Sequence, residues 1–142
     1  APWLTMDEAF EAAEKAGIAE DIRRMPMGMH TMISEGSGGI SGGQRQRLMI
    51  ARAIAPKPKI LMFDEATSAL DNITQRQVCE ALDAMKCTRI VIAHRLSTIK
   101  QCDRIIVLDG GHIVEDGTYR ELIDNKGYFY ELVERQRVDD ND

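Results

Sequence analysis

The chain has 142 residues, 44% of them hydrophobic, so it is long enough to form one ordinary domain with a buried core. Its formal net charge is −5 and it has no basic block, which argues against a nucleic-acid-binding surface. Its longest apolar runs are far shorter than the roughly 18 residues of a membrane span. Three scattered cysteines fit neither a zinc site nor a CxxC pair and are typical of a reducing, cytosolic environment.

The first third of the sequence predicts helices separated by a loop. Thr5–Glu8 has the form of a capping box, and the alanines that follow it at helical spacing stop at Gly17. A second, short helix is expected over residues 18–24. Residues 25–39 contain five glycines and prolines, so we expect an irregular loop. A helix should then run from residue 41 to residue 55, where two nearby prolines end it.

After residue 58 the hydrophobic pattern changes, and short apolar runs alternate with helical stripes. We expect strands at 59–63, 88–93 and 104–108, and a hairpin turn at Asp109 that leads into 112–115. We also expect three helices. One carries the apolar stripe Val78, Ala81, Leu82 and Met85, one follows the capping box 118–121, and one spans 127–137. We expect an irregular acidic tail at 138–142. Alternation of this kind predicts a parallel sheet with helices on its faces, which binds ligands beyond the carboxyl ends of its strands. Asp64 and His94 fall at such ends.

The stretch from Ser41 to Gln44 has two explanations. Ser41 can cap the following helix and Gln44 can complete a capping box, which together stabilise a helix by about 1 kcal/mol. That explanation leaves Gly42 and Gly43 unaccounted for, because alanine is the better helix former. The alternative is an anion site, since a helix N-terminus presents free N–H groups and glycines let a phosphate approach them. The motif alone leaves both explanations open.

Two adjacent carboxylates, Asp64 and Glu65, follow the apolar run of the first strand. One can hold a magnesium ion, directly or through water, and the other can orient a water molecule. Asp64 could also be a plain surface charge or a helix cap, and Asp71 could be the N-cap of the next helix. A lone histidine such as His94 is more often structural than catalytic, but its expected place at the same sheet edge favours a functional role.

In this order, the segments ISGGQRQR, ILMFDEATSALD and AHRLST closely resemble the nucleotide-binding domain of ATP-binding-cassette (ABC) transporters of the exporter type. The resemblance implies an α/β fold, a partial P-loop NTPase-like (RecA-like) parallel sheet with flanking helices and part of the ABC helical subdomain. Residues 1–55 would be the helical subdomain portion with the signature helix, 56–137 the C-terminal part of the RecA-like core, and 138–142 the acidic tail.

The resemblance also assigns roles to individual residues, with ATP and Mg²⁺ as cofactors. The signature would bind, in trans, the γ-phosphate of ATP held by an opposing subunit. Asp64 would bind Mg²⁺, through water, Glu65 would be the catalytic carboxylate and His94 would contact the γ-phosphate. The signature residues are Ser41, Gly42, Gly43 and Gln44, and the D-loop residues, which would reach across the dimer, are Ser68, Ala69, Leu70 and Asp71.

The partners that the resemblance implies are a second nucleotide-binding domain and the transmembrane domains of an exporter. The segment Thr31–Glu35 would face those transmembrane domains, which puts the chain at the cytoplasmic face of a membrane. The amino-acid sequence of residues 34–39 is similar to that of the corresponding segment in peptide and bacteriocin exporters.

One departure from the family pattern is large, because no GxxxxGK[ST] P-loop occurs in the 142 residues. We therefore expect a C-terminal fragment of an exporter ATPase domain, inactive as an ATPase by itself. Two alternatives remain: a soluble, non-transport ABC ATPase of DNA repair or translation, or a non-enzymatic half-site module that completes a partner's active site. The first would usually carry coiled-coil or basic insertions, which are not seen, and the full gene would test the second.

Overall fold

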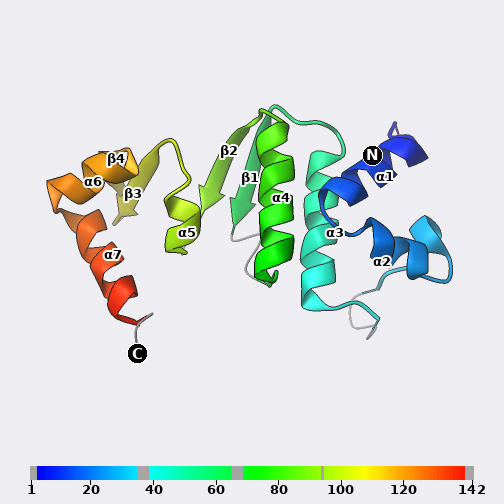
Figure 1. Cartoon of the computed structure of the whole chain (residues 1–142). Coiled ribbons are helices and arrows are strands. Elements are labelled where there is room, and N and C mark those ends of the chain that lie inside the picture. The colour runs from blue at the N-terminus through cyan, green and yellow to red at the C-terminus, as the bar shows by residue number, and fades with distance from the viewer. Residues whose placement is uncertain (1–2, 35–38, 65–68, 94, 140–142) are drawn as a thin grey trace. The chain divides into compact units, whose positions relative to one another are not determined.

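A computed structural model describes residues 3–34, 39–64, 69–93 and 95–139 of the chain (Figure 1). The chain divides into two compact units, Ala1–Ile92 and Ala93–Asp142.

The helices of the first unit follow the sequence predictions closely. They are α1 (Met6–Lys15), α2 (Ala19–Arg24), the 3-10 helix η1 (Gly28–His30), α3 (Gly42–Ile54) and α4 (Asn72–Ala84). The predicted capping box of α1 is confirmed, because the Thr5 hydroxyl accepts the N–H of Glu8 at 3.2 Å and the Glu8 carboxylate accepts the N–H of Thr5 at 2.8 Å. Gly17 has φ +71°, the left-handed conformation that ends a helix. The turn η1 was not predicted.

Two strands of the first unit form the predicted parallel pairing. β1 (Ile60–Asp64) and β2 (Thr88–Ile92) run parallel, with Ile60 opposite Thr88 and Asp64 opposite Ile92. Their carboxyl ends therefore finish level with each other at one edge. This register confirms that the residues after the two strands start from the same edge of the sheet.

The core of the first unit lies between its helices and one face of this sheet. Its buried residues come from α1 to α4, from β1 and from the linking segments: Ala12, Ala13, Ala16, Ile18, Ala19, Ile22, Ile50, Ala51, Ile54, Leu61, Leu70, Val78 and Leu82. The small alanine side chains of α1 permit its close packing on α3. The other sheet face is apolar and exposed: Ile60, Met62, Ile90 and Ile92 keep between 50% and 74% of their accessible surface.

The second unit is built on a β-hairpin. Its elements are α5 (Leu96–Ile99), β3 (Ile105–Asp109), β4 (His112–Gly117), α6 (Tyr119–Asn125) and α7 (Tyr128–Asp139). β3 and β4 pair antiparallel, with Asp109 opposite His112, and the predicted turn is made by Gly110 and Gly111 at φ +54° and +79°. α7 continues to Asp139, so the irregular tail predicted from residue 138 is wrong for two residues; residues 140–142 lie outside the described part.

A carboxylate of β4 fixes the start of α7. The Glu115 side chain accepts the N–H of Phe129 at 2.6 Å and the side-chain amide of Asn125 at 2.9 Å. Phe129 is buried in the core of this unit and meets Tyr119 edge to face, with ring centroids 5.7 Å apart. A Cβ at Gly127 would overlap the Glu115 carboxylate, so a larger residue there would push this carboxylate away from its hydrogen bonds.

We expect Gly127→Ala to lower the free energy of unfolding by about 1–2 kcal/mol, because the added methyl displaces a carboxylate that satisfies a helix N-terminus. Chemical denaturation measures the change. Gly39→Ala is the matched control, since a Cβ there would meet no atom of the described structure within 4 Å. Equal stability of the two variants would contradict this account of Gly127.

Candidate functional site

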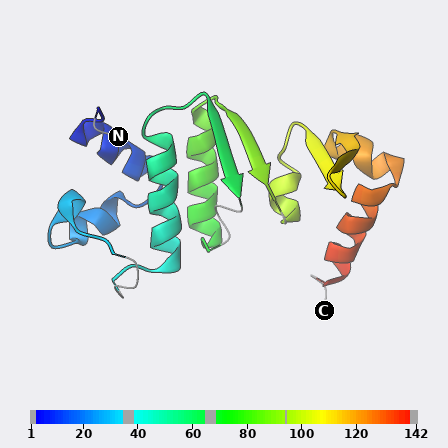
Figure 2. The same ribbon diagram turned by 180° about the vertical axis from the view of Figure 1, so that it is seen from behind.

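One end of the first unit collects most of the residues that the sequence singles out. α3 and α4 both begin at the end where the arrows of β1 and β2 finish, as Figures 1 and 2 show. Ser41 stands at the start of α3, Asp64 at the end of β1, and Asp71 at the start of α4. Glu65, Ser68 and His94, together with Glu35 of the exporter-like segment, lie outside the described residues.

The start of α3 is a complete capping box. The Ser41 hydroxyl accepts the N–H of Gln44 at 3.1 Å, and the Gln44 side-chain oxygen accepts the N–H of Ser41 at 2.9 Å. The capping explanation of Ser41 and Gln44 is therefore confirmed. A helix leaves its first N–H groups without intrahelical acceptors. The box satisfies the N–H groups of Ser41 and Gln44. The N–H groups of Gly42 and Gly43, which lie between them, have no hydrogen-bond partner within the described residues.

Packing inside the chain explains one glycine and not the other. A Cβ at Gly43 would come within 3.2 Å of the carbonyl oxygen of Ala69, which is closer than such contacts normally allow. A Cβ at Gly42 would meet only the Ala69 side chain, at an ordinary 4.0 Å. The approach of residues 69 and 70 thus favours glycine at position 43, while nothing in the described structure requires glycine at position 42.

Residues 69 and 70 are held against α3 by two further contacts. The N–H of Ala69 donates to the side-chain oxygen of Gln46 at 3.0 Å. Leu70 is 8% exposed and belongs to the main core. The start of α3 and the segment before α4 therefore form one packed substructure.

Asp71 is the N-cap of α4, one of the two roles that the sequence left open. Its carboxylate accepts the backbone N–H groups of Ile73 at 3.0 Å and Thr74 at 2.9 Å, and the Thr74 hydroxyl at 2.8 Å. The bond from the Thr74 backbone, followed by that from its hydroxyl, holds the pKa of Asp71 below its usual value. Capping does not exclude a further role for this side chain.

Asp64 is exposed at the carboxyl end of β1, where a carboxylate can reach a ligand. No group of three or more acidic, histidine or cysteine side chains gathers within the described ranges, so these residues supply no all-protein metal cage. Magnesium usually takes one or two carboxylates together with phosphate oxygens and water. The single carboxylate of Asp64 at this edge of the sheet is compatible with such a coordination.

Sequence reasoning missed Asp21 of α2, which contacts the start of α3. Its two carboxylate oxygens accept the Gln44 side-chain amide at 2.8 Å and the Arg47 guanidinium at 3.1 Å. No local sequence pattern predicts these contacts, because Asp21 precedes Gln44 by 23 residues and Arg47 by 26 residues.

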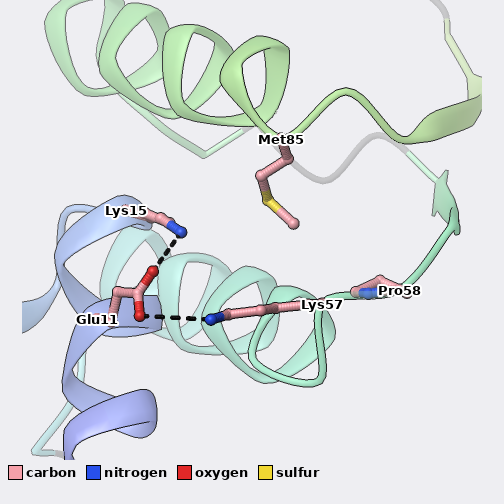
Figure 3. Close-up of a pocket in the computed structure, with 5 residues that line it drawn as sticks. All are labelled: Glu11, Lys15, Lys57, Pro58 and Met85. Atoms are coloured by element: carbon pink, nitrogen blue, oxygen red, sulfur yellow. Dashed lines mark hydrogen bonds and ion pairs between the residues drawn. The ribbon is translucent and has the colours of Figure 1, made fainter.

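A surface hollow of the first unit lies away from this end (Figure 3). It is lined by Glu11, Lys15, Lys57, Pro58 and Met85, of which Lys57 and Pro58 precede β1 and Met85 follows α4. Glu11 pairs with Lys15 at 2.7 Å and with Lys57 at 3.7 Å, so a single carboxylate is shared by the two lysines of the hollow. It holds none of the residues to which the sequence assigns a role in binding or catalysis.

Comparison with known proteins connects this arrangement to a family. The sequence model described as "ABC transporter" matches residues 1–68. The chain is 47% identical over 137 residues to the alpha-hemolysin translocation ATP-binding protein HlyB of Escherichia coli O157:H7, covering 92% of this chain and 19% of that protein. It is 45% identical over 134 residues to the ATP-dependent lipid A-core flippase of Francisella novicida, covering 93% of this chain and 23% of that protein.

A solved structure agrees with the sequence relatives. A bacterial Atm1-family ABC exporter with ATP bound matches with a TM-score of 0.89 and 40% identity, covering 96% of this chain and 24% of that one. The match confirms the predicted partial P-loop NTPase-like α/β fold. The chain spans less than a quarter of each of these relatives. No helix in the described ranges has the length and apolar character needed to cross a membrane.

Asp71 should give the protein an acid-sensitive contribution to stability. Because the folded pKa lies below the ordinary value of 3.8, the contribution is complete above that value and is lost as pH falls through the lowered pKa. Asp71→Asn keeps a good cap without a titrating group. Unfolding measured from about pH 6 to about pH 2 should show the wild-type advantage over this variant disappearing at the acid end. A difference that does not change with pH would contradict the assignment.

The two glycines of α3 should differ in stability when replaced. Gly42→Ala is expected to leave the free energy of unfolding unchanged or to raise it by up to about 1 kcal/mol, since alanine favours the helix. Gly43→Ala should be about 1–3 kcal/mol less stable than Gly42→Ala, because its methyl presses on the Ala69 carbonyl. Denaturant titration of both variants measures this, and equal stabilities would refute the packing account.

Proposed function

The chain belongs to the ABC transporter family, and we propose that it is the signature-bearing part of an ATPase subunit that powers export across a membrane. The names of the relatives support transport, since one is a translocation ATP-binding protein and another an ATP-dependent flippase. The exposed apolar face of β1 and β2 supports a place in a larger domain, because uncovered apolar sheet faces are normally packed against other elements.

The observation that carries the proposal is the pair of N–H groups at Gly42 and Gly43. They lie in the first turn of a 13-residue helix, whose N-terminus attracts anions. Gly42 is exposed, and its missing side chain serves no packing need in the described chain. A phosphate approaching from outside gives that glycine a purpose, because any side chain there would stand in its way.

We propose that this phosphate is the γ-phosphate of ATP bound to an opposing subunit. The 142 residues contain no GxxxxGK[ST] segment, so in this proposal such a segment of another subunit grips the nucleotide and presents it to Ser41, Gly42 and Gly43. The 142 residues by themselves would then neither bind ATP tightly nor hydrolyse it. Residues 68–71 are proposed to be the D-loop, and the close approach of Ala69 to Gly43 supports placing this loop next to the signature.

The hydrolytic roles are proposed for the residues that follow β1 and β2. Asp64 would hold Mg²⁺, directly or through water, and the ion when bound would neutralise phosphate charge. Glu65 would orient the attacking water and His94 would contact the γ-phosphate. The parallel register of Asp64 with Ile92 supports this grouping, because it starts both following segments from one sheet edge.

The transmembrane partner is proposed to bind the segment from Thr31 to Glu35. Thr31 is tied to the turn η1, since its hydroxyl donates to the carbonyl of Gly28 at 2.7 Å. Next to it Met32 and Ile33 are 90% and 50% exposed. Adjacent exposed apolar side chains that directly follow a hydrogen-bonded turn suit a protein contact, and such a contact would bring the chain to the cytoplasmic face of the membrane.

Substitutions of Ser41 separate phosphate binding from capping. In the complete transporter subunit, Ser41→Asp keeps a good N-cap and should melt normally, but it places a negative charge beside the proposed γ-phosphate. At an effective dielectric near 20, unit charges about 4 Å apart repel by about 4 kcal/mol. ATP-dependent dimerisation and turnover should therefore collapse in Ser41→Asp and suffer less in Ser41→Ala.

The measurements are thermal melting and ATP-dependent dimerisation of both variants beside the wild type. If the start of α3 serves only as a cap, alanine should be the less stable variant and aspartate should behave like the wild type. An aspartate variant that melts normally and dimerises with wild-type ATP dependence would overturn the proposed function.

A further inference from the structure

We infer that Asp21 of α2 is a positioning residue that holds the signature turn of α3 in its phosphate-receiving form. The inference rests on the proposed function of that turn and adds a residue outside the motifs by which the family was recognised. It starts from a chain of contacts that runs from α2 through Gln44 to the backbone of Ser41.

The first link fixes the orientation of the Gln44 side chain. A carboxylate can only accept hydrogen bonds, so the group that Gln44 turns toward Asp21, 2.8 Å away, must be its NH₂. The side-chain oxygen of Gln44 then faces the N–H of Ser41, at 2.9 Å. Asp21 thereby selects the one amide orientation that closes the capping box and leaves only the glycine N–H groups for a ligand.

The second link is Arg47, one helical turn after Gly43. Its guanidinium donates to the other Asp21 oxygen at 3.1 Å and to the carbonyl of Gly17 at 2.5 Å, and its Nε approaches the Gly43 carbonyl at 3.4 Å. The Arg47 and Asp21 side chains are only 17% and 28% exposed, so solvent screens this pair less than an exposed one. Through Arg47 the carboxylate ties α3 to the bend between α1 and α2.

Asp21 is therefore a hydrogen-bond partner of both Gln44 and Arg47, the two α3 side chains that contact the signature turn and α2. Without its carboxylate, only the N–H of Ser41 favours the orientation in which the Gln44 oxygen faces it, and a flipped amide would present NH₂ to that N–H. The capping box then opens part of the time. A γ-phosphate would have to restore it, which weakens nucleotide-dependent association without removing any group that touches the phosphate.

The test uses the complete transporter subunit with Asp21→Ala and Asp21→Asn. The ATP concentration for half-maximal dimerisation should rise about tenfold in Asp21→Ala, while turnover at saturating ATP stays within about twofold. Asp21→Asn, which keeps one acceptor oxygen for Gln44, should show a smaller rise. A residue that only stabilises the fold would lower the melting temperature without this split between half-saturation and maximal rate.

Glu20→Ala is the matched control, because it removes a neighbouring carboxylate of α2 whose partner is the exposed Arg23. Its ATP dependence should equal that of the wild type. The side-chain NH₂ signals of Gln44 in a nitrogen-15 NMR spectrum give a readout without nucleotide, and they should shift in Asp21→Ala and not in Glu20→Ala.

Ser41→Asp in the same assay separates the two possible failures. If Ser41→Asp abolishes dimerisation while folded Asp21→Ala and Asp21→Asn keep wild-type ATP dependence, the positioning role of Asp21 is refuted and the proposed function stands. Unchanged Gln44 signals in Asp21→Ala would refute it as well. If Ser41→Asp dimerises normally, the proposed function itself fails and the inference falls with it.

Discussion

The capping box between Ser41 and Gln44 is the interaction on which the candidate site depends. It satisfies the N–H groups of Ser41 and Gln44, while those of Gly42 and Gly43 have no hydrogen-bond partner within the described residues. Capping and the proposed phosphate binding are therefore compatible within one turn. A turn without this box would offer four competing donors, and a phosphate would have no fixed place among them.

The parallel register of β1 and β2 and the packing of Ala69 on Gly43 bring the other predicted groups to the same end. Asp64 ends its strand opposite Ile92, and α4 begins beside α3 because Leu70 is buried in the shared core. The site thus depends on elements that also form the core of the first unit. Changes in the core around Leu70 should reach the signature turn through Ala69.

Local patterns made much of this predictable from the sequence. The three capping boxes, the glycine turn of the hairpin and the helical spacing of the apolar residues in α1 and α4 involve residues close together in the chain, and all are confirmed. Contacts between distant residues could not be predicted in this way. Asp21 reaches Gln44 across 23 positions, and the preference for glycine at position 43 arises from the nearby carbonyl of Ala69. The roles of Glu65, Ser68 and His94 remain predictions from the family motifs.

The central claim is that the glycine N–H groups of α3 receive the γ-phosphate of ATP from an opposing subunit. The most direct test is an experimental structure of the complete protein trapped as a dimer with a non-hydrolysable ATP analogue. The account predicts a γ-phosphate oxygen about 2.7–3.2 Å from the backbone nitrogen of Gly42 or Gly43, on a nucleotide gripped by the other subunit. A trapped dimer in which that phosphate contacts no part of residues 41–44 would contradict it.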